Sequence, residues 1–86
     1  MFLRGGLLKK EKEKTRFNSN IKYLLDSQII SVKTLMNITG ATESMVSMWR
    51  NGKREGTLRD CIKISRFLNI SIDELISDEI SKKIKK

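Results

Sequence analysis

The stretch SVKTLMNITGATESMVSMWRNGKR, residues 31–54, decides the fold of this chain. Ser31 is a favoured helix N-cap, and the apolar side chains after it, Leu35 among them, recur at helical spacing. Gly40 then supplies the left-handed backbone conformation that ends a helix at little cost. We therefore predict a short helix over residues 32–39 that ends in a glycine turn.

A second short helix is predicted over residues 43–51. Thr42 can cap it, and Val46 and Trp49 share one side because they are three residues apart. Asn51-Gly52 ends the helix, and two basic residues, Lys53 and Arg54, follow at once. Two short helices joined by a tight glycine turn, with positive charge at the exit, are typical of a helix-turn-helix that reads DNA.

A set of residues over most of the chain stands in the order and spacing of a known family: Ile21, Leu24, Leu35, Gly40, Val46, Ser47, Trp49, Asn51-Gly52-Lys53, Leu58, Ile64, Leu68, Asn69 and Ser71-Ile72-Asp73-Glu74-Leu75. In these residues the chain resembles the Cro and phage-repressor-like helix-turn-helix family, also called the XRE family, without gaps from about Ile21 to Ile76. This resemblance implies a compact, all-α, five-helix domain of the lambda-repressor type, with the helix-turn-helix at helices 2 and 3. Members of that family bind operator DNA, usually as dimers.

The chain departs from the family pattern in its first motif helix and around the turn. Val32 replaces a common glutamine, Met36 replaces a small alanine, and Ala41 replaces a large aliphatic residue. We interpret the last two as a volume exchange, because cores tolerate substitutions that conserve total volume. After the tryptophan, where the family often has an acid, Arg50 adds a positive charge.

The second motif helix is the predicted reading helix. At about 100° per residue, its face opposite Val46 and Trp49 carries Ser44, Ser47, Met48 and Asn51. The resemblance assigns base-edge contacts to Glu43, Ser44, Ser47 and Met48, and phosphate contacts to Lys33, Thr42, Asn51, Lys53 and Arg54. Glu43 has an equally weighted alternative, since an acid near a helix N-terminus also stabilises the helix dipole.

Three further helices are expected around the motif. Helix 1 begins at Asn18 or Ser19, with Phe17 before the cap as a hydrophobic staple. Helix 4 begins after a Thr57 cap assisted by Asp60, and helix 5 after a Ser71–Glu74 capping box. The predicted core stripe of helix 4 is Leu58, Cys61, Ile62, Ser65 and Leu68, and the resemblance implies a dimer contact at Ile70 and Ile72.

The predicted organisation has three parts: a flexible basic arm over residues 1–16, the DNA-binding domain over 17–77, and a charged tail over 78–86. The arm is read as a solvated lead-in, with contact along DNA as the alternative. In the tail, Ile76, Ile80 and Ile84 recur every four residues, which could extend helix 5 as a partner-binding stripe. A frayed, solvated tail is the preferred interpretation.

Composition narrows the function classes. The 86 residues make one small domain, and 18 Lys and Arg against 10 Asp and Glu give a formal charge of +8, which suits a polyanionic partner. The absence of histidine and the single cysteine, Cys61, argue against histidine-based catalysis and Cys/His zinc sites, so we expect no catalytic residues, metal or cofactor. No run approaches the roughly 20 apolar residues of a membrane span, and a reducing cytoplasm is the expected location.

The sequence thus predicts a sequence-specific regulator of transcription, acting as a repressor through a homodimer on a palindromic double-stranded operator. The alternative is an antitoxin or anti-repressor, an interaction module that binds a regulatory protein partner through helix 5 and the C-terminal tail. An enzyme is the least favoured class, because no nucleophile and base are visibly paired.

Overall fold

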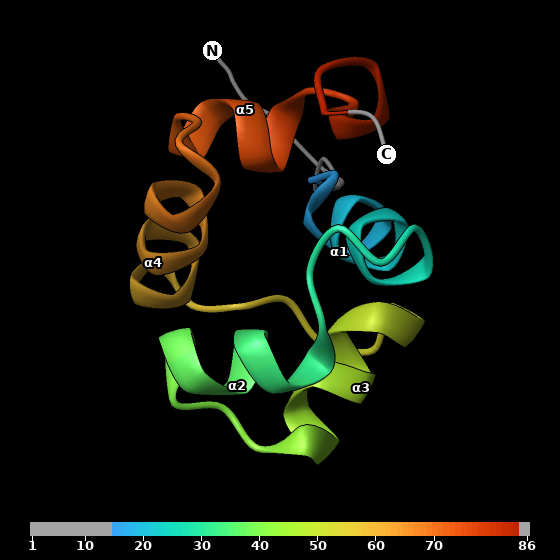
Figure 1. Cartoon of the computed structure of the whole chain (residues 1–86), viewed down its shortest axis with the longest axis vertical. Helices are drawn as coiled ribbons and strands as arrows, with labels where there is room; N and C mark the ends of the chain where they lie inside the picture. Colours follow the sequence, from blue (N-terminus) through green and yellow to red (C-terminus); the bar gives the residue numbers. More distant parts are fainter. Residues whose placement is uncertain (1–14, 85–86) are drawn as a thin grey trace, which may run out of the picture.

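The computed structural model describes residues 15–84 and is all-helical over that range (Figure 1). The five-helix, all-α prediction is confirmed, and a short 3₁₀ helix follows the fifth helix. In the part of the chain described, no helix is long and apolar enough to cross a membrane. The elements are α1 (Phe17–Asp26), α2 (Val32–Thr39), α3 (Glu43–Asn51), α4 (Leu58–Leu68), α5 (Ile72–Ser77) and the 3₁₀ helix (Ile80–Lys82).

The helices enclose the core from all sides. Figure 1 shows α1 and α4 facing each other across the molecule, with α2 and α3 at one end and α5 and the 3₁₀ helix at the other. We refer to these as the α3 end and the α5 end. The C-terminal segment returns to lie against α1, so segments that are far apart in the sequence close the α5 end.

The predicted N-caps of α2, α3, α4 and α5 are confirmed. The hydroxyls of Ser31 and Thr42 accept hydrogen bonds from the backbone N–H groups three residues on, at 3.0 and 3.1 Å. Thr57 with Asp60, and Ser71 with Glu74, each form a reciprocal capping box. These bonds satisfy N–H groups that a helix start leaves without partners, so the local sequence fixes where these four helices begin.

Helix α1 begins earlier than predicted, at Phe17 rather than at Asn18 or Ser19. The preceding residue, Arg16, is the N-cap and uses no side-chain bond; its backbone N–H donates to the carbonyl oxygen of Ile76 at 2.7 Å. Contact with α5 therefore holds the chain before the helix. The rest of the expected arm, residues 1–14, lies outside the described residues.

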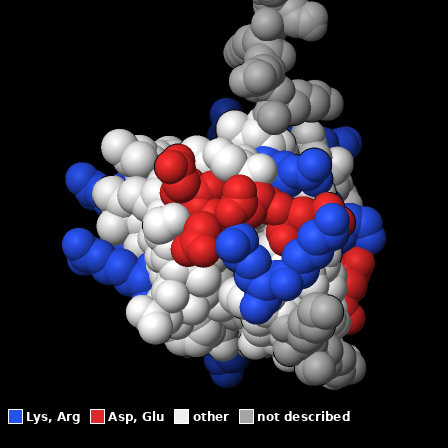
Figure 2. Space-filling view, turned by 90° about the horizontal axis from the view of Figure 1, so that it is seen from above, with Lys and Arg blue, Asp and Glu red and all other residues white. Residues whose placement is uncertain are grey.

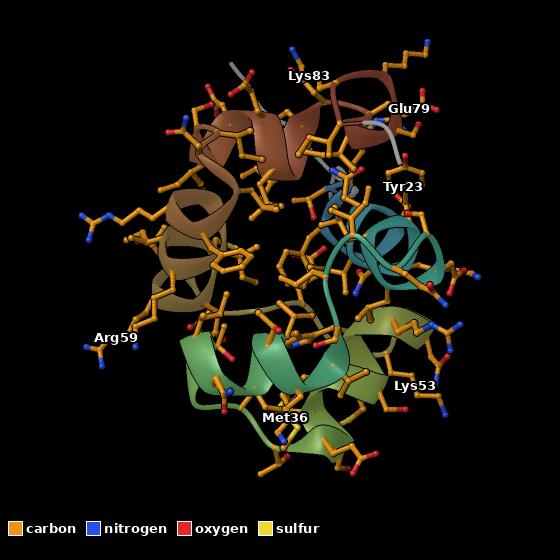
Figure 3. The ribbon with its side chains drawn as sticks, viewed as in Figure 1. Tyr23, Met36, Lys53, Arg59, Glu79 and Lys83 are labelled. Carbon is orange, nitrogen blue, oxygen red and sulfur yellow. The ribbon has the colours of Figure 1, made fainter. Side chains whose placement is uncertain are left out.

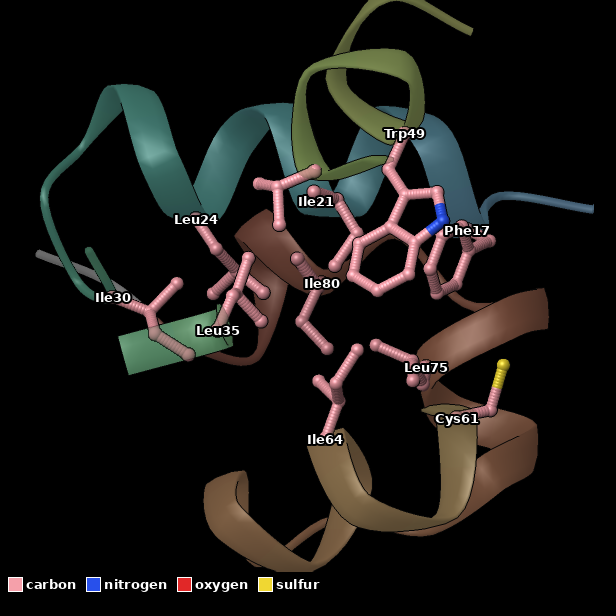
Figure 4. Close-up of a cluster of buried hydrophobic side chains, with 11 residues drawn as sticks. Phe17, Ile21, Leu24, Ile30, Leu35, Trp49, Cys61, Ile64, Leu75 and Ile80 are labelled. Atoms are coloured by element: carbon pink, nitrogen blue, oxygen red, sulfur yellow. The ribbon is translucent and has the colours of Figure 1, made fainter. Parts of the chain in front are cut away.

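Phe17 and Trp49 form the aromatic centre of the core (Figure 4). Both side chains are 1% exposed, and their rings meet edge to face with centroids 5.6 Å apart. Phe17 is thus a core residue, not a staple outside the helix. The indole Nε1 of Trp49 is buried and has no hydrogen-bond partner among residues 15–84, and Figure 4 shows it on the side of the ring that faces Phe17.

The core stripe of α4 is rotated from the predicted one. Leu58 is 68% exposed and Ile62 is only half-buried, whereas Ile64 is fully buried beside Cys61 and Ser65. At about 100° per residue, the last three residues share one direction and Ile62 lies roughly a right angle away from it. Burial also raises the pKa of the Cys61 thiol, with a smaller contribution from Asp60, so Cys61 is a neutral core residue.

The C-terminal segment packs into the core, and the expectation of a frayed tail is wrong for residues 78–84. Ile80 is fully buried and the hydroxyl of Tyr23 donates to the carbonyl oxygen of Ile84 at 2.8 Å. Asn20 holds this segment: its side-chain NH₂ donates to the carbonyl oxygens of Leu75 (2.6 Å) and Asp78 (2.9 Å). Its side-chain oxygen accepts from the N–H of Ile80 at 3.0 Å, so all of these buried polar groups are satisfied.

Candidate nucleic-acid interface

The turn between α2 and α3 has the geometry that the sequence predicts. Gly40 adopts a left-handed conformation with φ of +81°, and its N–H donates to the carbonyl oxygen of Met36 at 2.8 Å. Ala41 and Thr42 then lead directly into α3. Both Met36 and Ala41 are half-buried against the core, and Figure 3 shows Met36 on the side of α2 toward α3. Their volume exchange remains a prediction.

One side of α3 is buried and the other is open. Val46 and Trp49 are each 1% exposed. Ser44, Ser47 and Asn51 are exposed on the opposite face and Met48 is half-buried there; the Asn51 amide lies 3.4 Å from the Ser47 hydroxyl. Glu43 is exposed in the first turn. The structure therefore brings Ser44, Ser47, Met48 and Asn51 together on a solvent-facing surface, with Glu43 at its edge.

The exit from α3 is fixed by backbone hydrogen bonds. Gly52 adopts a left-handed conformation with φ of +80°. Its N–H donates to the carbonyl oxygen of Trp49 at 3.3 Å, and the N–H of Lys53 donates to the carbonyl oxygen of Met48 at 2.9 Å. This pair of bonds is the Schellman ending, which needs a residue that accepts positive φ. The backbone of Lys53 is consequently held one turn beyond the exposed face of α3.

The predicted phosphate-binding cations are exposed. Lys33 lies in the first turn of α2, and Lys53 and Arg54 lie in the segment after α3. Within residues 15–84, none of the three takes part in an ion pair. Thr42 is also exposed; its oxygen accepts the Met45 N–H as the cap, which leaves its O–H as the donor for another group.

Arg50 differs from its predicted role, because its charge is neutralised within the domain. Its guanidinium pairs with Asp26 of α1, and Lys22 reaches the same carboxylate at 2.7 Å. Hydrogen bonds from Lys22, and secondly from Arg50, hold the pKa of Asp26 below its ordinary value. Arg50 thus ties α3 to α1 and is not free for an external anion.

Asn18 is a site residue that the local sequence pattern missed. Its side-chain NH₂ donates to the carbonyl oxygens of Trp49 at 2.8 Å and Arg54 at 2.7 Å. The Thr15 hydroxyl adds a bond to the Glu55 carboxylate at 2.8 Å. Partners 31 to 40 residues away give no periodic signal, so sequence reasoning interpreted Asn18 only as a possible cap.

A hollow lies between the start of α1 and the segment after α3. It is lined by Thr15, Arg16, Asn18, Ser19, Gly52, Lys53, Arg54 and Glu55.

Ile70 and Ile72, the predicted dimer contact, are half-buried and pack against the core from the start of α5. They lie near the α5 end, whereas the open face of α3 and the cations after it lie at the α3 end. Among the described residues, no three His, Cys, Asp or Glu side chains gather in a way that could hold a metal ion.

Comparisons with known proteins agree with this geometry. No curated protein matches the chain significantly. A crystal structure of a transcriptional regulator from Listeria innocua has the same fold, with a TM-score of 0.67 and 17% sequence identity; the match covers 83% of this chain and 72% of that one. A helix-turn-helix family model matches residues 21–75. The chain therefore belongs to the helix-turn-helix family, of the XRE type, whose members are DNA-binding domains.

Proposed function

We propose that the protein is a sequence-specific regulator of transcription that places α3 in the major groove of double-stranded DNA. It acts in the cytoplasm as a repressor, by occupying an operator and blocking polymerase. Family membership supports DNA binding, and the open face of α3 supports the mode of binding. The observation that carries the proposal is the juxtaposition of that face with Lys53 and Arg54, two exposed cations on a fixed backbone.

In this proposal Glu43, Ser44, Ser47 and Met48 contact base edges. Glu43 accepts a hydrogen bond from a cytosine amino group, the serines bond to either base type, and Met48 packs on a thymine methyl group. No Arg, Gln or Asn precedes Asn51 in α3, so bidentate base contacts are few. We therefore expect modest base discrimination, supplemented by sequence-dependent DNA shape.

Phosphate contacts supply most of the affinity. Lys33 and Thr42 approach the backbone from the start of α2 and of α3. Asn51, Lys53 and Arg54 approach it where α3 ends. Each phosphate that a cation neutralises releases counterions, which makes binding weaken as salt rises.

The functional unit in this proposal is a homodimer on a palindromic operator. Ile70 and Ile72 form the contact between copies, which sets two α3 helices about 34 Å apart in successive major grooves. Half-buried apolar residues on the surface suit such a contact, because dimerisation completes their burial.

The test is a salt series of binding to labelled duplexes, one taken from upstream of the protein's own gene and one with the same bases scrambled. Lys53→Ala should lower the log–log salt slope by about 1. Arg59→Ala is the matched control, because Arg59 is an exposed cation that points to the side of the molecule opposite Lys53 (Figure 3). Equal affinity for both duplexes, or equal slopes for the two variants, would contradict the proposal.

A further inference from the structure

Asn18 links three parts of the α3 end with one side chain. The residue lies in the first turn of α1, and both hydrogens of its NH₂ group are used. One goes to the carbonyl oxygen of Trp49 in the last turn of α3, at 2.8 Å. The other goes to the carbonyl oxygen of Arg54, at 2.7 Å. These distances are at the short end of the range for N–H···O bonds.

Residues 52–55, which we call the exit loop, have few other attachments to the rest of residues 15–84. The Schellman bond holds the backbone at Lys53, but the N–H of Arg54 lies 3.4 Å from its acceptor, the Met48 carbonyl oxygen. The other side-chain contact, from Thr15 to Glu55, joins two exposed residues. Among the described residues, the bond from Asn18 to Arg54 is therefore the principal tie between the exit loop beyond Lys53 and the body of the domain.

The chemistry at this position requires two donors on one planar group. Trp49 and Arg54 both present carbonyl oxygens, which only accept hydrogen bonds. The amide of asparagine supplies two N–H groups, whereas an aspartate would face two carbonyl oxygens with acceptors alone. A serine has a single donor and could serve only one of the two oxygens.

We propose that Asn18 is a positioning residue for DNA binding: it fixes the exit loop so that Lys53 and Arg54 meet the phosphate backbone while α3 lies in the groove. The inference rests on the proposed function. Lys53 and Arg54 are long and exposed, so their direction depends on a backbone that is already held before DNA arrives. Asn18 touches no DNA in this scheme and acts through the loop.

The test compares Asn18→Ala and Asn18→Asp with Ser19→Ala, a neighbouring exposed residue whose hydroxyl bonds only locally, to the carbonyl oxygen of Arg16. We expect both Asn18 variants to lower the log–log salt slope by about 1 to 2 and to weaken binding roughly 10-fold at low salt. Ser19→Ala should leave both values unchanged. In a Lys53→Ala/Arg54→Ala background, Asn18→Ala should have almost no further effect on DNA binding, because the phosphate contacts that Asn18 positions are already absent.

Amide hydrogen exchange of the free protein gives a readout that does not involve DNA. In Asn18→Ala, exchange at Gly52 and Lys53 should accelerate, while exchange in the centre of α4 should stay at the wild-type rate. A lower melting temperature with an unchanged salt slope would overturn the positioning role and leave Asn18 as a purely structural residue. Additive losses in the triple variant would overturn it as well.

The two proposals fail in different ways. If the wild-type protein shows no salt-dependent duplex binding, the proposed function fails. If it binds duplex and the Asn18 variants bind with the wild-type slope, only the role of Asn18 fails. Unchanged exchange at Gly52 and Lys53 in Asn18→Ala also overturns the positioning role, whatever the wild-type protein binds.

Discussion

Two asparagines, two residues apart in α1, hold opposite ends of the molecule. Asn18 is half-buried and bonds to carbonyl oxygens at the α3 end, whereas Asn20 is 3% exposed and bonds to three backbone groups at the α5 end. Since successive residues on a helix are about 100° apart, positions i and i+2 point in nearly opposite directions. The same side-chain amide thus holds two different parts of the domain, because Asn18 and Asn20 differ in burial and in hydrogen-bond partners.

The two ends also differ in charge. At the α3 end, Lys53 and Arg54 are free of ion pairs among the described residues. Figure 2 looks onto the α5 end, where acidic side chains gather with basic ones beside them. There the ammonium group of Lys83 lies 3.3 Å from the carboxylate of Glu74 and 3.6 Å from that of Asp78. Lys83 at the α5 end is therefore paired within the domain, whereas, within residues 15–84, Lys53 and Arg54 at the α3 end are not, as the proposed phosphate contacts require.

The largest expected effect is at the α5 end. Ile80→Ala should destabilise the domain by about 3 kcal/mol, because the side chain is fully buried and its loss leaves a cavity. Thermal unfolding followed by circular dichroism measures this, with exposed Lys82→Ala as the control. If Ile80→Ala melted within a degree or two of wild type, the α5 end would not be part of the core.

The burial of Ile80 also limits how the alternative function can be tested. A protein truncated at Asp78 would lack this core residue, so the truncation cannot separate DNA binding from a partner-binding role of helix 5 and the tail.

Asn20→Ala should destabilise by about 2 kcal/mol, because it leaves buried groups at Leu75 and Ile80 without hydrogen-bond partners. Measured where the variant is still folded, its salt slope for duplex binding should equal that of wild type. This result separates Asn20 from Asn18, for which the slope is expected to fall. A reduced slope in Asn20→Ala would show that the two ends are coupled through α1.

Gln28→Gly should stabilise the protein by about 1 kcal/mol, because a left-handed residue with a side chain is strained. Gln28 has φ of +61° just after α1 and is exposed, so the substitution removes strain without removing a packed side chain. The melting temperature should rise by about 4–8 °C for a domain of this size. Because Gln28 makes none of the hydrogen bonds that hold the exit loop among the described residues, neither the salt slope nor exchange in the exit loop should change. A fall in melting temperature would contradict the inference that the left-handed backbone at Gln28 is strained.

The smallest expected effect is acid sensitivity at the contact between α1 and α3. The folded-state pKa of Asp26 is lowered from its ordinary value of 3.8, chiefly by the hydrogen bond from Lys22 and then by Arg50. Its stabilising contribution is therefore complete above that value and is lost as the pH falls through the lowered pKa. Asp26→Asn should be less stable than wild type at neutral pH, with a difference that disappears in acid. A difference that persisted at low pH would exclude the ion pair as its cause.

Local features of this fold could be predicted and long-range features could not. The caps at Ser31, Thr42, Thr57 and Ser71 are bonds within three residues, so their partners stand next to them in the sequence. The contacts of Asn18 with α3, and of Asn20 with residues 75–80, span 31 to 60 residues. One signal was present: Asn20 occupies the same apolar side of α1 as Phe17, Ile21 and Leu24. A polar residue in a core position indicates a buried hydrogen-bond network.

In the candidate site, too, local features could be predicted from the sequence and long-range contacts could not. Helical geometry was sufficient to predict which side of α3 is open, because Val46 and Trp49 define the buried side. The partner of Arg50 was not predictable, since Asp26 lies 24 residues away on another helix. The roles of Glu43, Ser44, Ser47 and Met48 toward bases remain predictions, to be tested by binding.

The edge-to-face contact of Trp49 with Phe17 gives the protein a built-in optical probe. The chain has a single tryptophan, so all indole emission comes from the seam between α1 and α3. Because that ring is shielded from water in the native state, its fluorescence will shift to longer wavelength only when this seam opens. An unlabelled sample therefore reports directly whether α3 is still docked against α1, during denaturation and in the presence of a ligand.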